Sequence, residues 1–149
     1  MKAYLAHSFA TRFEVRDKIT PIIEEIFPEY EVMNPFLREN RENSAIFEYE
    51  GTSEEGLAKH REKENVTVDY RNEIIVEGDL KDVKECDILI CYIDDVLSFG
   101  APCEIFYAAY ILKKPVYVVF KNKNSGLYHH PWVNYLSTEK IILDDSYGI

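Results

Sequence analysis

The chain has 149 residues, a length that suits one domain burying about two-thirds of its unfolded surface around a single core. Its formal net charge of −10 at pH 7 argues against a nucleic-acid partner, although a small anion can still be held locally. Three cysteines without paired spacing, no run of about eighteen apolar residues and no apolar leader at the amino terminus predict a reduced, cytoplasmic protein with no membrane partner.

The first half of the chain alternates between strand and helix patterns. A short strand over residues 2–6 precedes a helix over 14–26, in which isoleucines recur at helical spacing. A second strand over 30–33 is stopped by Asn34-Pro35. From 36 to 65 the sequence is polar and highly charged without a clean period, so we expect an irregular excursion over the mouth of a site. A solvated loop without any role is the alternative.

The second half of the chain continues this alternation. A helical stretch over 66–86, interrupted at Gly78, is followed by a buried strand over 88–93. A helix over 102–112, beginning near Pro102, then leads to another buried strand over 116–120. A further helical stretch over 127–136 and a last strand over 140–143 complete the series. With right-handed crossovers, this order predicts an α/β fold in one domain over residues 1–149. We expect a doubly wound five-stranded parallel sheet in strand order 2-1-3-4-5, a Rossmann-like or flavodoxin-like three-layer sandwich.

Two acids fall near the carboxyl edge of the predicted sheet. Glu104 lies in the first turn of the helix after a central strand, where open parallel sheets bind ligands, although it also suits a helix-capping acid. Asp79 follows Gly78 and is otherwise a turn residue or helix cap. Two acids facing one pocket suit glycosyl transfer, because one attacks or stabilises the anomeric carbon while another group protonates the departing base. Ser98 and Gly100, beside the helix start, supply donors for an anion.

Other chemistries lack their sequence patterns. The cysteines are not paired in spacing, and His129 and His130 are adjacent, so they cannot share a helical face as metal ligands. No segment resembles the phosphate-binding pattern GxxxxGK[ST], and no G-x-S-x-G turn is present for a nucleophilic serine. We therefore expect neither a metal nor a cofactor.

Three motifs in order resemble those of a known family. They are Tyr4-Leu5-Ala6-His7-Ser8, then Gly78-Asp79-Leu80 followed by Cys86-Asp87, then Ser98-Phe99-Gly100-Ala101-Pro102-Cys103-Glu104. Outside residues 36–65, the chain is similar to the nucleoside 2-deoxyribosyltransferase superfamily. The resemblance implies a doubly wound sheet and cleavage of N-glycosidic bonds through a glutamyl-enzyme intermediate. It also implies that Glu104 is the nucleophile, that Asp79 contacts the sugar or assists departure of the base, and that Tyr4 hydrogen-bonds the catalytic carboxylate.

One position within the third motif favours a branch of this family. Members that act on free nucleosides carry an aspartate six residues before the nucleophile, and this chain has Ser98 there. The pattern resembles the nucleoside 5′-monophosphate N-glycosidases (2′-deoxynucleoside 5′-phosphate N-hydrolases), which implies that Ser98, with Gly100 and Ser8, binds the substrate phosphate. A hydroxyl donates to a phosphate dianion, whereas a carboxylate repels it. The plain interpretations are a turn residue for Ser98 and a loop hydroxyl for Ser8.

The chain departs from this branch in the first motif. The branch has glycine before the position of Ser8 and arginine two residues after it, and this chain has His7 and Ala10. Arg12 or His7 is the expected substitute for the missing cation. The resemblance also implies a homodimer or higher homo-oligomer in which a neighbouring subunit completes the site, and His130 is a candidate phosphate ligand from that loop.

Three functions follow as hypotheses. The first is hydrolysis of a nucleoside 5′-monophosphate to free base and sugar 5-phosphate. The second is base exchange on unphosphorylated 2′-deoxynucleosides by a nucleoside 2-deoxyribosyltransferase. The third is a non-catalytic nucleotide-binding module that has kept the fold. In all three, the partner is a small-molecule nucleotide or nucleoside.

Overall fold

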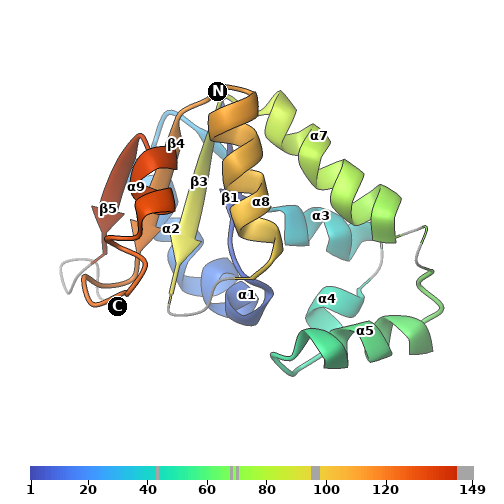
Figure 1. Cartoon of the computed structure of the whole chain (residues 1–149). Helices are drawn as coiled ribbons and strands as arrows, with labels where there is room; N and C mark the ends of the chain where they lie inside the picture. Colours follow the sequence, from blue (N-terminus) through green and yellow to red (C-terminus); the bar gives the residue numbers. More distant parts are fainter. Residues whose placement is uncertain (43, 68, 70, 95–97, 144–149) are drawn as a thin grey trace.

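A computed structural model describes residues 1–42, 44–67, 69, 71–94 and 98–143 (Figure 1). Its centre is one sheet of five parallel strands, in the order β2-β1-β3-β4-β5. The strands are β1 (Lys2–Ala6), β2 (Glu31–Met33), β3 (Ile88–Ile93), β4 (Val116–Phe120) and β5 (Glu139–Ile142). The predicted α/β fold and the strand order 2-1-3-4-5 are therefore confirmed.

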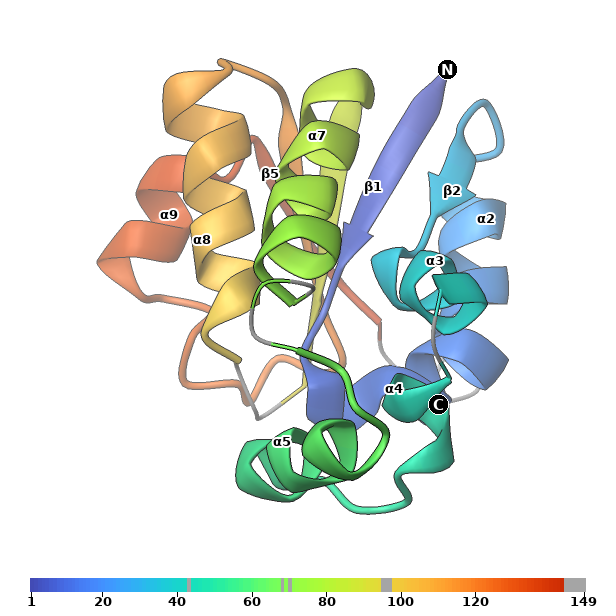
Figure 2. The same ribbon diagram turned by 90° about the vertical axis from the view of Figure 1, so that its right-hand side faces the viewer.

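Helices cover both faces of the sheet (Figures 1 and 2). One face carries η3 (Arg71–Glu77), α7 (Gly78–Glu85), α8 (Gly100–Phe106), η4 (Tyr107–Ile111) and α9 (Pro131–Leu136). The other carries η1 (Phe9–Thr11), α1 (Arg12–Glu14), η2 (Val15–Ile19) and α2 (Thr20–Ile26). The predicted helical stretch 66–86 corresponds to η3 and α7, and its residues 68 and 70 lie outside the described part. No helix in the described ranges is both long and apolar enough to cross a membrane.

Alternation along β1 decides which side chains face each helical layer. Tyr4 and Ala6 pack in the core beneath α7 and α8, whereas Ala3 and Leu5 pack in the core beneath η2 and α2. Successive side chains of a strand point to opposite faces, so this register sends the Tyr4 ring toward α8. The first core includes Ile105 of α8. Tyr4 is therefore held directly below the helix that carries Glu104.

The segment 36–65 is not the irregular excursion that we expected. It forms α3 (Pro35–Glu42), α4 (Ala45–Glu48) and α5 (Glu54–Lys63), and the last two lie beyond the carboxyl ends of the strands (Figures 1 and 2). The helical period is weakened in the sequence because charged residues share the inward faces with apolar ones such as Ile46 and Leu57. Glu39 of α3 is 3% exposed and pairs with Arg61 of α5. Buried ion-paired residues count as polar in a hydrophobicity pattern, so no apolar stripe marks these helices.

Arg12 joins the first helical layer to the segment around α4. Its guanidinium is fully buried and donates to the backbone carbonyls of Phe9 (3.0 Å), Ile46, Tyr49 and Gly51 (3.0 Å). These carbonyls satisfy the donors of the guanidinium, which would be costly to bury without acceptors. The side chain predicted to supply a phosphate cation is thus wholly engaged in holding α4 and the following loop in place.

Candidate active site

A cavity of about 310 Å³ opens where the carboxyl ends of the central strands meet the helices from the 36–65 segment. This size lies at the lower end of the range for small-molecule sites, about 300–1,000 Å³. Its lining comes from the loop after β1, from α3, α5, η3 and α7, and from the start of α8. Open parallel sheets bind ligands at this edge. Asp79, Ser98, Gly100 and Glu104 all line this one cavity, although they are distant in sequence.

Glu104 extends from α8 with one carboxylate oxygen inside the protein. The residue as a whole is partly exposed, but its Oε2 is buried and has no hydrogen-bond partner among the described residues. Burial raises the pKa of Glu104 to about 8, and the nearby charge of Asp79 raises it further, while the Tyr4 hydroxyl and Arg38 oppose the rise. Gly100 lies one turn before Glu104 and has no side chain; a Cβ there would lie 3.7 Å from Glu104 Oε1, in ordinary van der Waals contact.

Asp79 is held by an arginine that sequence reasoning missed. The Arg38 guanidinium pairs with the carboxylates of Asp79 and Asp82 (2.7 Å to Asp82 Oδ2) and donates to the Ile74 carbonyl at 2.7 Å. Burial nonetheless raises the pKa of Asp79 to about 7, against the opposing charge of Arg38. Gly78 makes room for this arrangement, because a Cβ there would lie only 2.6 Å from Arg38 Nη1.

Tyr4, on β1 beneath α8, is the third residue of the group that contains Glu104 and Asp79. The residue is fully buried, and its hydroxyl forms no hydrogen bond that meets ordinary geometric limits. Burial, followed by the charges of Glu104 and Asp79, raises the pKa of Tyr4 well above its usual value. The hydroxyl therefore stays protonated and faces a buried carboxylate that also lacks a partner. A small rotation of either side chain brings donor and acceptor together, because both groups are otherwise unsatisfied.

Ser8 and Ser98 line a second, adjoining pocket of about 270 Å³. It shares Phe9, Glu54 and Ser98 with the main cavity. Ser8 Oγ lies 3.1 Å from the Thr11 hydroxyl, and Ser98 Oγ accepts weakly from the Ala101 N–H at 3.5 Å. The described lining of this pocket contains no lysine or arginine. Its one charged member is the carboxylate of Glu54.

Neither predicted substitute for the missing cation supplies a positive charge to these pockets. Arg12 lines neither of them and is bound to backbone carbonyls. His7 lines the cavity, but burial lowers its pKa to about 4, so the ring is neutral. Its Nε2 lies 3.1 Å from Asn34 Oδ1 and its Nδ1 lies 3.2 Å from the Ser8 carbonyl, and the neutral ring donates to one of these two acceptors. His7 is thus an uncharged side chain between β1 and α3 and brings no positive charge to the cavity.

His130 lies away from the cavity of its own chain. It precedes α9, where its Nδ1 accepts from the Trp132 N–H at 3.2 Å, and it lines an apolar hollow between α8 and α9. Whether it contacts phosphate in a neighbouring subunit stays a prediction.

Several charged residues of the cavity were absent from the predicted site. Glu39, Glu54, Arg61 and Arg71 line the cavity, and Arg38 lies behind the lining, paired with Asp79. All but Arg71 come from the segment 36–65, where no apolar period indicated an inward face. A usable signal is the position of Arg38-Glu39 just after the second strand, since residues following parallel strands gather at the ligand-binding edge.

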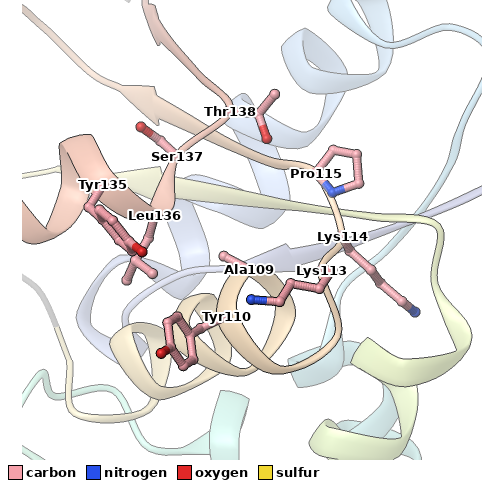
Figure 3. A pocket seen from close by; sticks show the side chains of 9 residues that line it. All are labelled: Ala109, Tyr110, Lys113, Lys114, Pro115, Tyr135, Leu136, Ser137 and Thr138. Carbon is pink, nitrogen blue, oxygen red and sulfur yellow. The ribbon is translucent and has the colours of Figure 1, made fainter.

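Larger hollows lie elsewhere and lack comparable chemistry. One of about 430 Å³ lies at the amino-terminal edge of β4, where Figure 3 shows Lys114 pointing away from Tyr135. Lys114 Nζ donates to backbone carbonyls at the end of α7, including Val83 at 3.0 Å. Outside the cavity, Glu48, His60 and Glu64 bring potential metal-ligand atoms within 4.8 Å of one another. His60 already pairs with Glu48 at 3.5 Å, and both carboxylates are exposed.

No protein-family model and no curated protein matches the chain. Among solved structures, it is similar to a 2-deoxyribosyltransferase from the psychrotolerant bacterium Bacillus psychrosaccharolyticus. The two share 25% sequence identity over 85% of this chain and 74% of that one, with a TM-score of 0.45. Structural agreement at this level carries no functional argument.

Proposed function

We propose that the protein cleaves the N-glycosidic bond of a nucleoside 5′-monophosphate and releases free base and sugar 5-phosphate. The observation that carries this proposal is the pairing of Glu104 with Asp79 in one buried cavity, close enough that the charge of Asp79 raises the pKa of Glu104. Carboxyl pairs with raised pKa values can supply a nucleophile and a proton donor at neutral pH. Arg38 holds Asp79 in an ion pair, and the Tyr4 hydroxyl lies near Glu104 and lowers its pKa.

The reaction proceeds in two displacements. The higher pKa of Glu104, about 8 against about 7 for Asp79, keeps the proton of the pair mainly on Glu104 in the empty protein. In the reactive form this proton is on Asp79, and the ionised Glu104 attacks C1′ to form a glycosyl ester while the bond from C1′ to the base nitrogen breaks. Asp79, protonated, delivers its proton to the departing base. Water then attacks C1′, the ester bond to Glu104 breaks, and the proton of the water returns to Asp79. Tyr4 and Arg38 both lower the pKa of Glu104, so they favour the ionised state that the first step requires.

The adjoining serine pocket supports a phosphorylated substrate. Ser8 and Ser98 come from different elements yet line the same hollow beside Glu104. Two hydroxyls and nearby backbone N–H groups can donate to phosphate oxygens. In the proposed complex, the sugar lies over Glu104 and its 5′-phosphate enters this pocket.

Glu54 favours a second candidate, base exchange on unphosphorylated 2′-deoxynucleosides. Its carboxylate lines the serine pocket, and no cation is found in the described lining. A carboxylate accepts a hydrogen bond from a free 5′-hydroxyl and repels a phosphate dianion. In that case a second base, instead of water, takes the sugar from Glu104.

Chromatographic detection of released base tests both candidates. Purified protein is incubated with nucleosides and their 5′-monophosphates, with and without a second free base. We expect release from the monophosphates, and Glu104→Gln should slow it at least about 100-fold because the nucleophile is lost. Glu25→Gln, on the exposed face of α2, is the control and should match the wild type. Base exchange that is independent of phosphate would favour the second candidate, and nucleotide binding without release would leave only a binding module.

We further propose that the protein acts as a homodimer through the face formed by α8 and α9. Large apolar side chains are exposed there: Phe106 (37%), Tyr110 (47%), Trp132 (63%) and Tyr135 (75%). Phe106 and Tyr110 stack at 5.1 Å and continue the apolar hollow beside Trp132. Exposed aromatic clusters of this kind mark association surfaces. Light scattering should give twice the mass of the chain, and Trp132→Glu should halve it; a monomeric wild type would contradict this proposal.

A further inference from the structure

Arg71 presents to the cavity a guanidinium whose Nε is buried without an acceptor among the described residues. It lines the cavity wall and forms no ion pair with any residue in the described ranges. The other arginines nearby are engaged: Arg38 with Asp79, Arg61 with Glu39, and Arg12 with backbone carbonyls. A partly desolvated donor without a partner is costly in the empty protein. The unpartnered donor of Arg71 therefore indicates a ligand that supplies hydrogen-bond acceptors.

Helical spacing places Arg71 at the end of the cavity remote from the serine pocket. Arg71, Ile75 and Asp79 recur every four residues on one helical face, and all three line the cavity. Arg71 is thus two turns, roughly 10 Å, beyond Asp79 along this wall. The opposite wall is α5, which runs from Glu54, shared with the serine pocket, to Arg61.

Arg61, near the end of α5, and Arg71, at the start of η3, line the same cavity. The chain turns directly after α5, where the Val66 N–H donates to the Arg61 carbonyl at 2.8 Å. Arg61 and Arg71 are therefore at the same end of the cavity, about 10 Å along α5 from Glu54. Figure 2 shows the chain rising from α5 into the helix that ends as α7.

The walls at this end suit a flat heterocycle. Leu57 and Ala58 of α5 and Ile75 of η3 give the cavity apolar lining, and the guanidinium of Arg71 adds hydrogen-bond donors to the same lining. Arginine pairs well with adjacent acceptors such as a carbonyl oxygen and a ring nitrogen of a base. When the 5′ end of a sugar occupies the serine pocket and C1′ lies at Glu104, the base extends toward this end.

We propose that Arg71 binds the departing base and selects bases with a carbonyl oxygen next to a ring acceptor, such as hypoxanthine, over their amino counterparts. This inference rests on the proposed N-glycosidic cleavage. Negative charge moves onto the base as its bond to C1′ breaks, and a guanidinium that donates to the carbonyl oxygen stabilises that charge. Asp79 then completes departure by protonating the base.

The matched substrates for a test are the hypoxanthine and adenine 2′-deoxynucleosides and their 5′-monophosphates, which differ only at the purine 6 position. We expect the wild type to favour hypoxanthine in kcat/KM. Arg71→Met should lower kcat/KM for hypoxanthine about 10- to 100-fold, the usual effect of losing a charged hydrogen bond, and should remove the preference. Arg71→Lys should restore part of it. Arg41→Met, an exposed arginine of α3, is the control and should keep the wild-type ratio.

Calorimetric measurement of the binding of free hypoxanthine and adenine distinguishes a failure of the inference about Arg71 from a failure of the proposed cleavage reaction. If the wild type cleaves substrates and Arg71→Met leaves both rates and the base preference unchanged, Arg71 does not bind the base, although the cleavage proposal stands. If no cleavage occurs but hypoxanthine binds and Arg71→Met weakens it tenfold or more, the cleavage proposal fails and the base site stands. Failure of the wild type both to cleave and to bind either base overturns both.

Discussion

The carboxyls of Glu104 and Asp79 differ from ordinary surface acids because burial disfavours their ionised forms, so both keep their protons to higher pH. Burial raises the pKa of Glu104 to about 8 and that of Asp79 to about 7. The position of both acids near the carboxyl edge of the sheet was predictable, since residues that follow or precede parallel strands meet there. The pairing of Asp79 with Arg38 was not predictable, because it depends on the path of α3. Their catalytic roles stay predictions.

The raised pKa of Glu104 predicts the acid limb of the pH profile of kcat/KM. Glu104 must be ionised to attack, so the rate should fall as pH drops below about 7 to 8, following protonation of the pair. Tyr4→Phe removes a group that lowers this pKa and should move the limb to higher pH. Initial rates of base release between pH 4 and 10 measure both effects. A limb near 4.5 in the wild type would show that Glu104 is not the titrating nucleophile.

At the scale of secondary-structure elements, the strands and the helices of the two main layers followed from local pattern. Short apolar runs such as 88–93 and 116–120 predict buried parallel strands, and both form. The helices α3 and α5 could not be predicted from apolar periodicity, because Glu39 and Arg61 neutralise each other on their inward faces. Such pairing is visible only once the partners are placed in space.

Arg12→Met should destabilise the segment that covers the site. The change removes the side-chain donor from the carbonyls of Ile46, Tyr49 and Gly51, whereas the Phe9 carbonyl keeps the Arg12 backbone N–H. We expect the free energy of unfolding to fall by about 2–4 kcal/mol. Urea denaturation followed by circular dichroism measures it. The exposed Arg41→Met should stay within about 0.5 kcal/mol of the wild type, and an equally small change for Arg12→Met would refute the structural role.

Gly78→Ala tests the link between α7 and the position of Arg38. Alanine favours the helix by about 0.5–1 kcal/mol, yet its Cβ would lie 2.6 Å from Arg38 Nη1 and push the guanidinium away from Asp79. Asp79 then loses the ion pair that holds its carboxyl in position. We expect near-normal thermal stability with base release reduced about tenfold or more. Unchanged kcat/KM would show that the contact between Arg38 and Asp79 is dispensable.

At the scale of the whole molecule, the two buried carboxyls link folding to pH. Their folded-state pKa values, about 8 for Glu104 and about 7 for Asp79, lie above their ordinary values, so the folded protein holds these protons more tightly than the unfolded chain. The stabilisation is fully present below about pH 4 and is lost as pH rises through 7 to 8.

Glu104→Gln should therefore be more stable than the wild type at high pH. The variant cannot ionise at this position, so at pH 9 its free energy of unfolding should exceed that of the wild type by about 2 kcal/mol. The difference should shrink toward zero near pH 4, where the wild-type carboxyl is protonated. Urea titrations at both pH values measure it. A variant that is equally or less stable at pH 9 would indicate that Glu104 is not desolvated.

The most direct test of the account is whether Glu104 becomes covalently attached to the sugar. Acid-quenched reactions with a 2′-deoxynucleoside 5′-monophosphate, and in parallel with the free nucleoside, are digested and analysed by mass spectrometry. We predict that the peptide containing Glu104 gains the mass of the substrate without its base, which is the glycosyl group. In Glu104→Gln this adduct should disappear, and base release should fall with it. Base release by Glu104→Gln at the wild-type rate, with no adduct on this peptide, would contradict the account.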